Sequence, residues 1–80
     1  MTRQEIEQIV RTFLIDDFEI DEDKINNQAK LKADLGIDSL DIVDIVVIVE
    51  KKFGFKMKPE EMKGVITLKD FCDYIEQKIN

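Results

Sequence analysis

The stretch Ala33-Asp34-Leu35-Gly36-Ile37-Asp38-Ser39-Leu40-Asp41 opens the segment around which the chain is organised, and that segment runs on to Phe53. Asp38 is a good helix N-cap, because its carboxylate can accept a hydrogen bond from a backbone N–H two or three residues later. Asp41 adds negative charge to the first turn, where the helix dipole favours it. Ser39 therefore takes the first helical position and should face outward. The chain contains no histidine, so no imidazole of its own can activate this hydroxyl.

The segment after Ser39 carries two conflicting signals. Seven of the eight residues from Ile42 to Val49 are β-branched, which by intrinsic propensity favours a strand. The Asp38 cap, a length of about four turns, and Gly54 at the position of a left-handed C-terminal cap favour a helix. Because tertiary packing often overrides propensity, we predict a helix over residues 39–53.

Composition limits the possible functions of the chain. Its 80 residues suit one small domain, residues 1–80, with a modest core. The net charge of −6 argues against nucleic acids and anionic membranes as partners and favours basic protein surfaces. The first residues show no secretory pattern, and the longest apolar run, Ile45 to Val49, is too short to insert across a membrane. A single cysteine permits no internal disulfide, which fits a cytoplasmic location.

The rest of the chain predicts two more main helices and one short one. Thr2 and Glu5 form a capping-box pattern ahead of a helix over 3–16. Residues 16–37 sustain no period and form a long loop, with apolar residues that can pin it to the core. Pro59 begins a short helix over 59–63, and Thr67 with Asp70 begins a helix over 68–79. The predicted fold class is all-α: a small antiparallel-type bundle of three main helices plus one short helix.

The residue types that carry catalysis or bind metals are absent or poorly placed. The acidic cluster from Asp16 to Asp23 could suggest a calcium-binding loop. If that loop began at Asp17, however, Glu22 would stand where the loop requires glycine, and Gln28 where it requires glutamate. Cys72 lies in the middle of the apolar face of the last helix, where it is better explained as a small core residue than as a nucleophile. We therefore expect no metal site and no catalytic residue.

The helix over 39–53 has two apolar faces. One face should meet the other helices, and it contains Ile42, Ile45, Val46, Val49 and Phe53. A single core does not need the second apolar face. We predict that the second face and its acidic flanks form a docking surface for enzymes whose apolar grooves have basic rims. This surface consists of Leu40, Asp41, Val43, Asp44, Val47 and Glu50. The alternative is an ordinary solvated helix surface.

The stretch from Ala33 to Asp41 closely resembles the attachment motif of acyl carrier proteins, and the resemblance extends to the acid-rich helix, the length and the apolar spacing at both ends. It implies that Ser39, flanked by Asp38 and Leu40, carries a covalent 4′-phosphopantetheine arm. A separate phosphopantetheinyl transferase would move this arm from coenzyme A onto Ser39. The arm's thiol would then hold acyl groups as thioesters and deliver them to acyl-loading and acyl-processing enzymes. A cytoplasmic monomer is expected.

Some features leave the pathway open. Lys51 and Lys52 stand where fatty-acid members of the resembling family usually continue the acidic run, so docking at the far end of the helix is uncertain. The cargo could belong to fatty-acid, polyketide or specialised lipid biosynthesis, or it could be a D-alanyl or aminoacyl group. The competing function class is an unmodified acidic helical module that only binds proteins.

Overall fold

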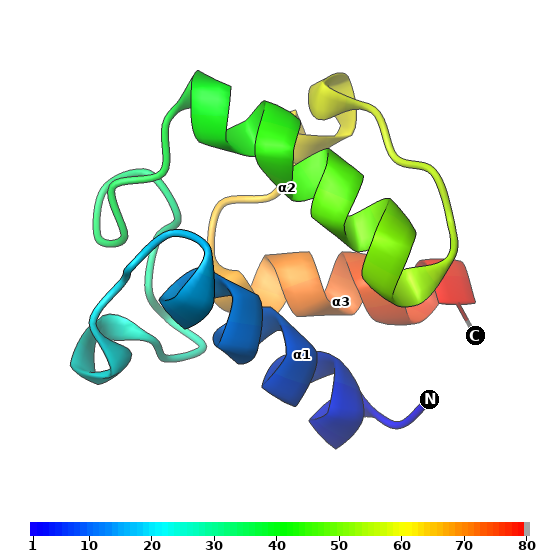
Figure 1. Cartoon of the computed structure of the whole chain (residues 1–80), viewed down its shortest axis with the longest axis horizontal. Helices are drawn as coiled ribbons and strands as arrows, with labels where there is room; N and C mark the ends of the chain where they lie inside the picture. The colour runs from blue at the N-terminus through cyan, green and yellow to red at the C-terminus, as the bar shows by residue number, and fades with distance from the viewer. Residues whose placement is uncertain (80) are drawn as a thin grey trace.

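The computed structural model describes residues 1–79 and has three long helices over that range, as predicted. They are α1 (Arg3–Asp16), α2 (Ser39–Phe53) and α3 (Leu68–Ile79), and their bounds match the predicted ranges (Figure 1). Two short 3₁₀ helices, η1 (Glu22–Lys24) and η2 (Pro59–Gly64), lie in the connections. No helix in the described part of the chain combines the length and the hydropathy needed to cross a bilayer.

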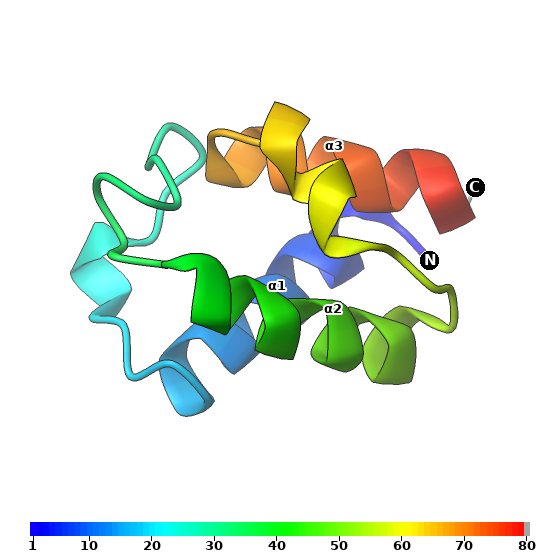
Figure 2. The same cartoon turned by 90° about the horizontal axis from the view of Figure 1, so that it is seen from above.

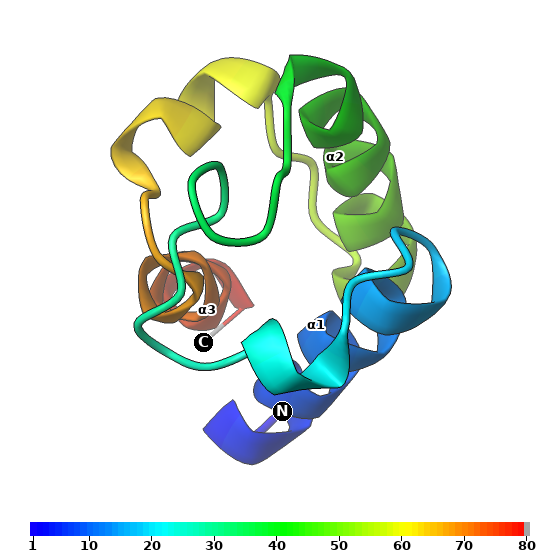
Figure 3. The ribbon, with the colours of Figure 1, turned by 90° about the vertical axis from the view of Figure 1, so that its left-hand side faces the viewer.

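The three long helices surround a common centre. α1 and α3 lie side by side, and α2 crosses over them (Figures 1 and 2). Seen from one end, the loop between α1 and α2 closes the bundle (Figure 3). α1 runs opposite to both other helices, but α2 and α3 run in the same general direction, because the segment containing η2 returns the chain to the same end. The predicted antiparallel arrangement is therefore wrong for the pair α2 and α3.

The core is built from all three helices and from the long loop. Phe13 of α1 lies edge-to-face with Phe71 of α3, with ring centroids 6.4 Å apart. Such aromatic pairs add to the stability that burial alone provides. The buried residues of the three long helices are Ile6, Val10, Phe13, Leu14, Ile45, Val49, Leu68, Phe71, Cys72 and Ile75.

α2 is a helix despite its β-branched residues, for reasons that packing explains. Intrinsic propensity costs at most about 0.7 kcal/mol per residue, whereas burying one Val or Ile side chain contributes about 1.5–3 kcal/mol. Ile45 and Val49 are 1% and 0% exposed, and Gly54 ends the helix in the left-handed conformation, with φ 79°. The inward face is narrower than predicted. Ile42, Val46 and Phe53 are only partly buried and pack at the edge of the core.

The loop between α1 and α2 is held in place by side chains and by its own backbone. Ile25, Ala29, Leu31 and Leu35 are buried, as the apolar spacing suggested. The sequence did not reveal that this loop also caps α3. The carbonyl oxygens of Asn27 and Ala29 accept the backbone N–H groups of Lys69 and Leu68, at 3.0 and 2.9 Å. Those N–H groups would otherwise have no partner within the helix.

The short helix after Pro59 is confirmed, but it is a 3₁₀ helix. The Glu61 carboxylate accepts the backbone N–H of Lys58 at 3.3 Å, and Met62 anchors the segment in the core. Short 3₁₀ pieces are common in connections of this kind.

Candidate functional site

The loop ahead of α2 fixes the position of Ser39. Leu35 and Ile37 are 8% and 3% exposed, and the backbone N–H of Ile37 donates to the carbonyl oxygen of Leu31 at 2.9 Å. Gly36 between them has φ 70°, a conformation that glycine adopts without steric cost. Two anchored apolar residues therefore deliver the chain to Asp38 at a defined point on the surface.

The first turn of α2 is closed by two reciprocal hydrogen bonds. The Asp38 carboxylate accepts the backbone N–H of Asp41 at 3.0 Å, and the Asp41 carboxylate accepts the backbone N–H of Asp38 at 3.1 Å. This capping box confirms the predicted N-cap. Ser39 is the first helical residue and is exposed. Because Asp38 and Asp41 provide the cap, the Ser39 hydroxyl is not needed for it.

The outer face of α2 carries a stripe of exposed apolar side chains. Leu40, Val43 and Val47 are 78%, 52% and 47% exposed, and their spacing of three and four residues places them on one side of the helix. Glu50 continues the stripe at the same spacing. Asp44 beside it is exposed, and Asp41 is half-buried. The six residues of the predicted docking surface thus share one accessible side of α2.

Cys72 is unsuited to nucleophilic chemistry. The side chain is 1% exposed, and burial raises the pKa of its thiol to about 11. A thiol with such a pKa is almost entirely protonated near neutral pH, and the thiolate is the reactive form. Within residues 1–79 no three acidic, cysteine or histidine side chains are grouped so that they could hold a metal ion.

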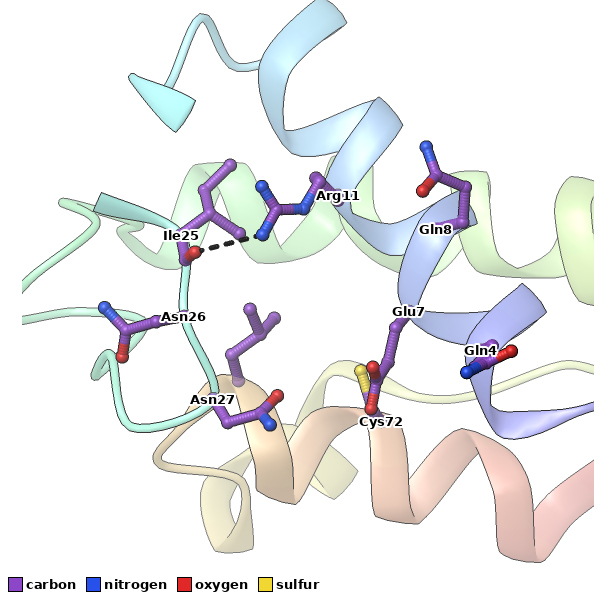
Figure 4. A pocket seen from close by; sticks show the side chains of 9 residues that line it. Gln4, Glu7, Gln8, Arg11, Ile25, Asn26, Asn27 and Cys72 are labelled. Atoms are coloured by element: carbon purple, nitrogen blue, oxygen red, sulfur yellow. Dashed lines mark hydrogen bonds between the residues drawn. The ribbon is translucent and has the colours of Figure 1, made fainter. Parts of the chain in front are cut away.

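A cleft of about 590 Å³ lies away from this site (Figure 4). Its walls are polar side chains of α1 and the loop residues 25–27, and Leu68 and Cys72 of α3 also line it. The Arg11 guanidinium donates to the carbonyl oxygen of Ile25 at 3.4 Å across one side of it. None of the residues that line the cleft belongs to α2, so it is separate from Ser39.

Two features near the helices could not be found by sequence pattern. The Arg3 guanidinium bonds Glu7 on its own helix and Asp73 and Glu76 on α3, at 2.9, 2.5 and 3.1 Å. Phe18, just after α1, lines a groove together with Val47 of α2. Both features depend on how distant segments pack, and no local spacing encodes them.

Comparisons with known proteins agree on one family. The model of the phosphopantetheine attachment site matches residues 8–75. The chain is 37% identical over 78 residues to the acyl carrier protein of Thermotoga maritima, covering 98% of this chain and 96% of that protein. It is also 37% identical over 79 residues to the acyl carrier protein of Coprothermobacter proteolyticus, covering 99% and 96% respectively.

A solved structure gives the same result for the fold. The acyl carrier protein of Enterococcus faecalis has a TM-score of 0.77 and 31% sequence identity, and the match covers 96% of this chain and 98% of that one. The match therefore includes the long loop and the connection between α2 and α3 as well as the three helices. This chain belongs to the acyl carrier protein family, and it is accordingly a non-catalytic carrier with a covalent 4′-phosphopantetheine group.

Proposed function

We propose that Ser39 is the residue to which the 4′-phosphopantetheine arm is attached. The observation that carries this proposal is an exposed serine hydroxyl at the first position of α2, left free by a cap that Asp38 and Asp41 form without it. A phosphodiester at this oxygen would displace neither capping bond. The positive end of the helix dipole also favours a phosphate at this position. The site therefore fits the group.

The chain does not activate Ser39 by itself. It has no histidine, and the nearest carboxylates, those of Asp38 and Asp41, already accept backbone hydrogen bonds. The base that removes the serine proton is therefore expected to belong to the phosphopantetheinyl transferase. The attached arm supplies a terminal thiol that holds acyl groups as thioesters. Because the arm is a long flexible tether, it keeps the acyl group at high effective concentration near a docked enzyme.

The same proposal assigns a role to the outer face of α2. Leu40, Val43 and Val47 provide apolar contact, and the carboxylates of Asp41, Asp44 and Glu50 attract basic side chains on the transferase and on acyl-processing enzymes. Ser39 lies at one end of this surface, so a partner that docks there has the arm at the edge of its contact area.

We further propose a single carrier domain that works as a cytoplasmic monomer in fatty-acid, polyketide or specialised lipid biosynthesis. The names of the relatives, all acyl carrier proteins at 30–37% identity, support an acyl cargo over a D-alanyl or aminoacyl one. They also count against the alternative of an unmodified binding module.

Intact-mass spectrometry tests the attachment site. The protein is incubated with coenzyme A and a broad-specificity phosphopantetheinyl transferase, and one phosphopantetheine group should be added. Ser39→Ala should abolish the addition and keep the helical circular dichroism spectrum, because the Ser39 side chain takes no part in the cap. Thr12→Ala is a control that removes another exposed hydroxyl and should be modified normally. An arm that still attaches to Ser39→Ala would refute the proposal.

A further inference from the structure

A continuous trough runs beside α2. Near the start of the helix, a groove of about 260 Å³ lies between α2 and residues 17–20. A second groove, of about 400 Å³, extends along the later turns of α2. The two grooves share Asp17, Phe18 and Asp44. The two grooves therefore adjoin, and the trough that they form includes Asp41, Asp44 and Val47 of the proposed docking surface.

The charge of this trough changes sign along its length. The end near Ser39 is lined by four carboxylates, those of Asp17, Glu19, Asp41 and Asp44. The far end is lined by Lys51 and Lys52, neither of which forms an ion pair with another described residue. Asp44 and Lys51 are seven residues apart, which corresponds to two turns and about 10 Å along the same side of a helix. This distance exceeds the screening length of about 8 Å at physiological ionic strength. A partner therefore meets an acidic region and a separate basic region.

The middle of the trough is apolar. Phe18, Val47 and Ile48 line the second groove between the acidic and the basic end, and Val47 is 47% exposed. The helix dipole by itself favours lysines in the last turn, which explains their charge. It does not explain why both lysines line the same groove as an exposed valine and Asp44.

We infer that the cognate partner of this carrier docks with a surface of mixed charge. That surface presents a cationic side chain to the acidic end, an apolar side chain to Phe18 and Val47, and a carboxylate to Lys51 and Lys52. The inference rests on the proposed docking function of α2 and adds the partner's charge pattern to it. The two lysines also act as a specificity device, because they repel an enzyme whose docking surface is basic along its whole length.

Two synthetic helical peptides of equal length test this inference on the phosphopantetheinylated protein. Both have a central leucine and arginines at one end, and they differ at the other end, which carries glutamates in the mixed peptide and arginines in the basic peptide. Fluorescence anisotropy gives the two dissociation constants. The protein should prefer the mixed peptide by about tenfold, the size expected for two exposed ion pairs, and the preference should shrink in high salt.

Charge-reversal variants locate the effect. Lys51→Glu/Lys52→Glu should invert the preference, so that the basic peptide binds more tightly. Lys30→Glu/Lys32→Glu, which changes the net charge by the same amount at exposed loop positions, should keep the preference for the mixed peptide. An unchanged preference after the Lys51 and Lys52 reversal, or no measurable binding of the mixed peptide to the unaltered protein, would overturn the inference.

The mass of each sample separates this inference from the proposed attachment site. A protein that gains no phosphopantetheine group contradicts the role of Ser39. A fully modified protein that does not discriminate between the peptides contradicts only the mixed-charge partner.

Discussion

At the scale of single residues, we propose that Asp38 both caps α2 and is recognised by the phosphopantetheinyl transferase. Its carboxylate caps α2 through the Asp41 backbone N–H, and it lies next to the proposed attachment serine. Removing an N-cap side chain costs about 0.5–2 kcal/mol. We expect Asp38→Ala to lower the free energy of unfolding by about 1 kcal/mol, measured by urea titration.

Asp38→Asn is the matched variant, because asparagine caps helices about as well as aspartate. It should restore most of the lost stability. If the transferase reads the Asp38 charge, Asp38→Asn should still be phosphopantetheinylated more slowly than the unaltered protein. Equal modification rates at equal stability would limit Asp38 to a structural role.

Local sequence predicted the single residues whose environment is local. The N-cap at Asp38, the exposed position of Ser39 and the left-handed Gly54 follow from nearest-neighbour chemistry. Helical spacing predicted that Cys72 is a core residue, and its burial confirms this. The packing of Phe18 against the core also followed from its apolar spacing in the loop, but the ion pairs of Arg3 could not be predicted, because they join segments far apart in the chain. The Arg3 guanidinium reaches Asp73, 70 positions later.

At the scale of elements, the acidic part of α2 should control how fast partners associate. Asp44 is the cleaner probe, because Asp41 also closes the capping box and its replacement would disturb the helix start. We expect Asp44→Lys to slow association with the phosphopantetheinyl transferase in stopped-flow experiments, with a loss that shrinks as salt is added. Asp23→Lys makes the same change in net charge at an exposed position in η1, and it should have a smaller effect.

The apolar stripe of α2 should instead control how long a partner stays bound. Val43 is 52% exposed, so its truncation leaves the core intact. Val43→Ala should raise the dissociation rate and leave the association rate nearly unchanged, since short-range apolar contact forms only after encounter. Dissociation rates for the transferase complex measure this directly. If neither rate changes, the exposed stripe is ordinary surface.

The elements differ in how well their sequences predicted them. α1 and α3 have capping pairs and a regular apolar spacing, so their bounds followed from local signals. α2 had to be inferred against its β propensity from its two caps, and the packing of Ile45 and Val49 supplies the stability that offsets that propensity. The 3₁₀ form of η2 and the capping of α3 by the loop could not be predicted, because both depend on where the bundle leaves space for the connections.

At the scale of the whole molecule, ionised carboxylates link α3 to α1 and cap the start of α3. Hydrogen bonds from Arg3 and Lys69 lower the pKa of Asp73, and the backbone N–H groups of Thr67 and Ile66 lower that of Asp70. A carboxyl group with a lower pKa in the folded state stabilises the fold above its unfolded pKa of about 3.9, and this contribution is lost as the pH falls through the folded pKa.

The melting temperature should therefore fall as the pH drops from about 5 to about 2. Between about pH 5.5 and pH 7 it should be nearly constant, because the chain has no histidine to titrate there. Calorimetric scans across this range measure the effect. Asp73→Asn should weaken the acid dependence. If the melting temperature of this variant falls by the same amount at low pH, the contact between Arg3 and Asp73 contributes little to the pH dependence of stability.

The core against which α2 packs is closed to solvent. Ile45, Val49, Phe71 and Ile75 are each at most 1% exposed. Truncating Ile45 to alanine should cost about 2–5 kcal/mol, which approaches the roughly 3–5 kcal/mol that a core of this size supplies. Ile45→Ala is therefore expected to be largely unfolded. Ile45→Val, with an expected cost of about 0.5–1.5 kcal/mol, keeps the test within measurable range.

We propose that this core also takes up part of an acyl cargo, because it lies inside the bundle whose helix α2 begins at Ser39. A chain that enters must separate α2 from α1 and α3, and it gains about 0.8 kcal/mol for each methylene that it buries. We expect the melting temperature to rise from the unloaded to the short-chain and medium-chain forms. Ile45→Val should show a steeper rise, because its smaller side chain leaves room for part of the cargo. A melting temperature that does not depend on chain length, in both proteins, would place the cargo outside the bundle.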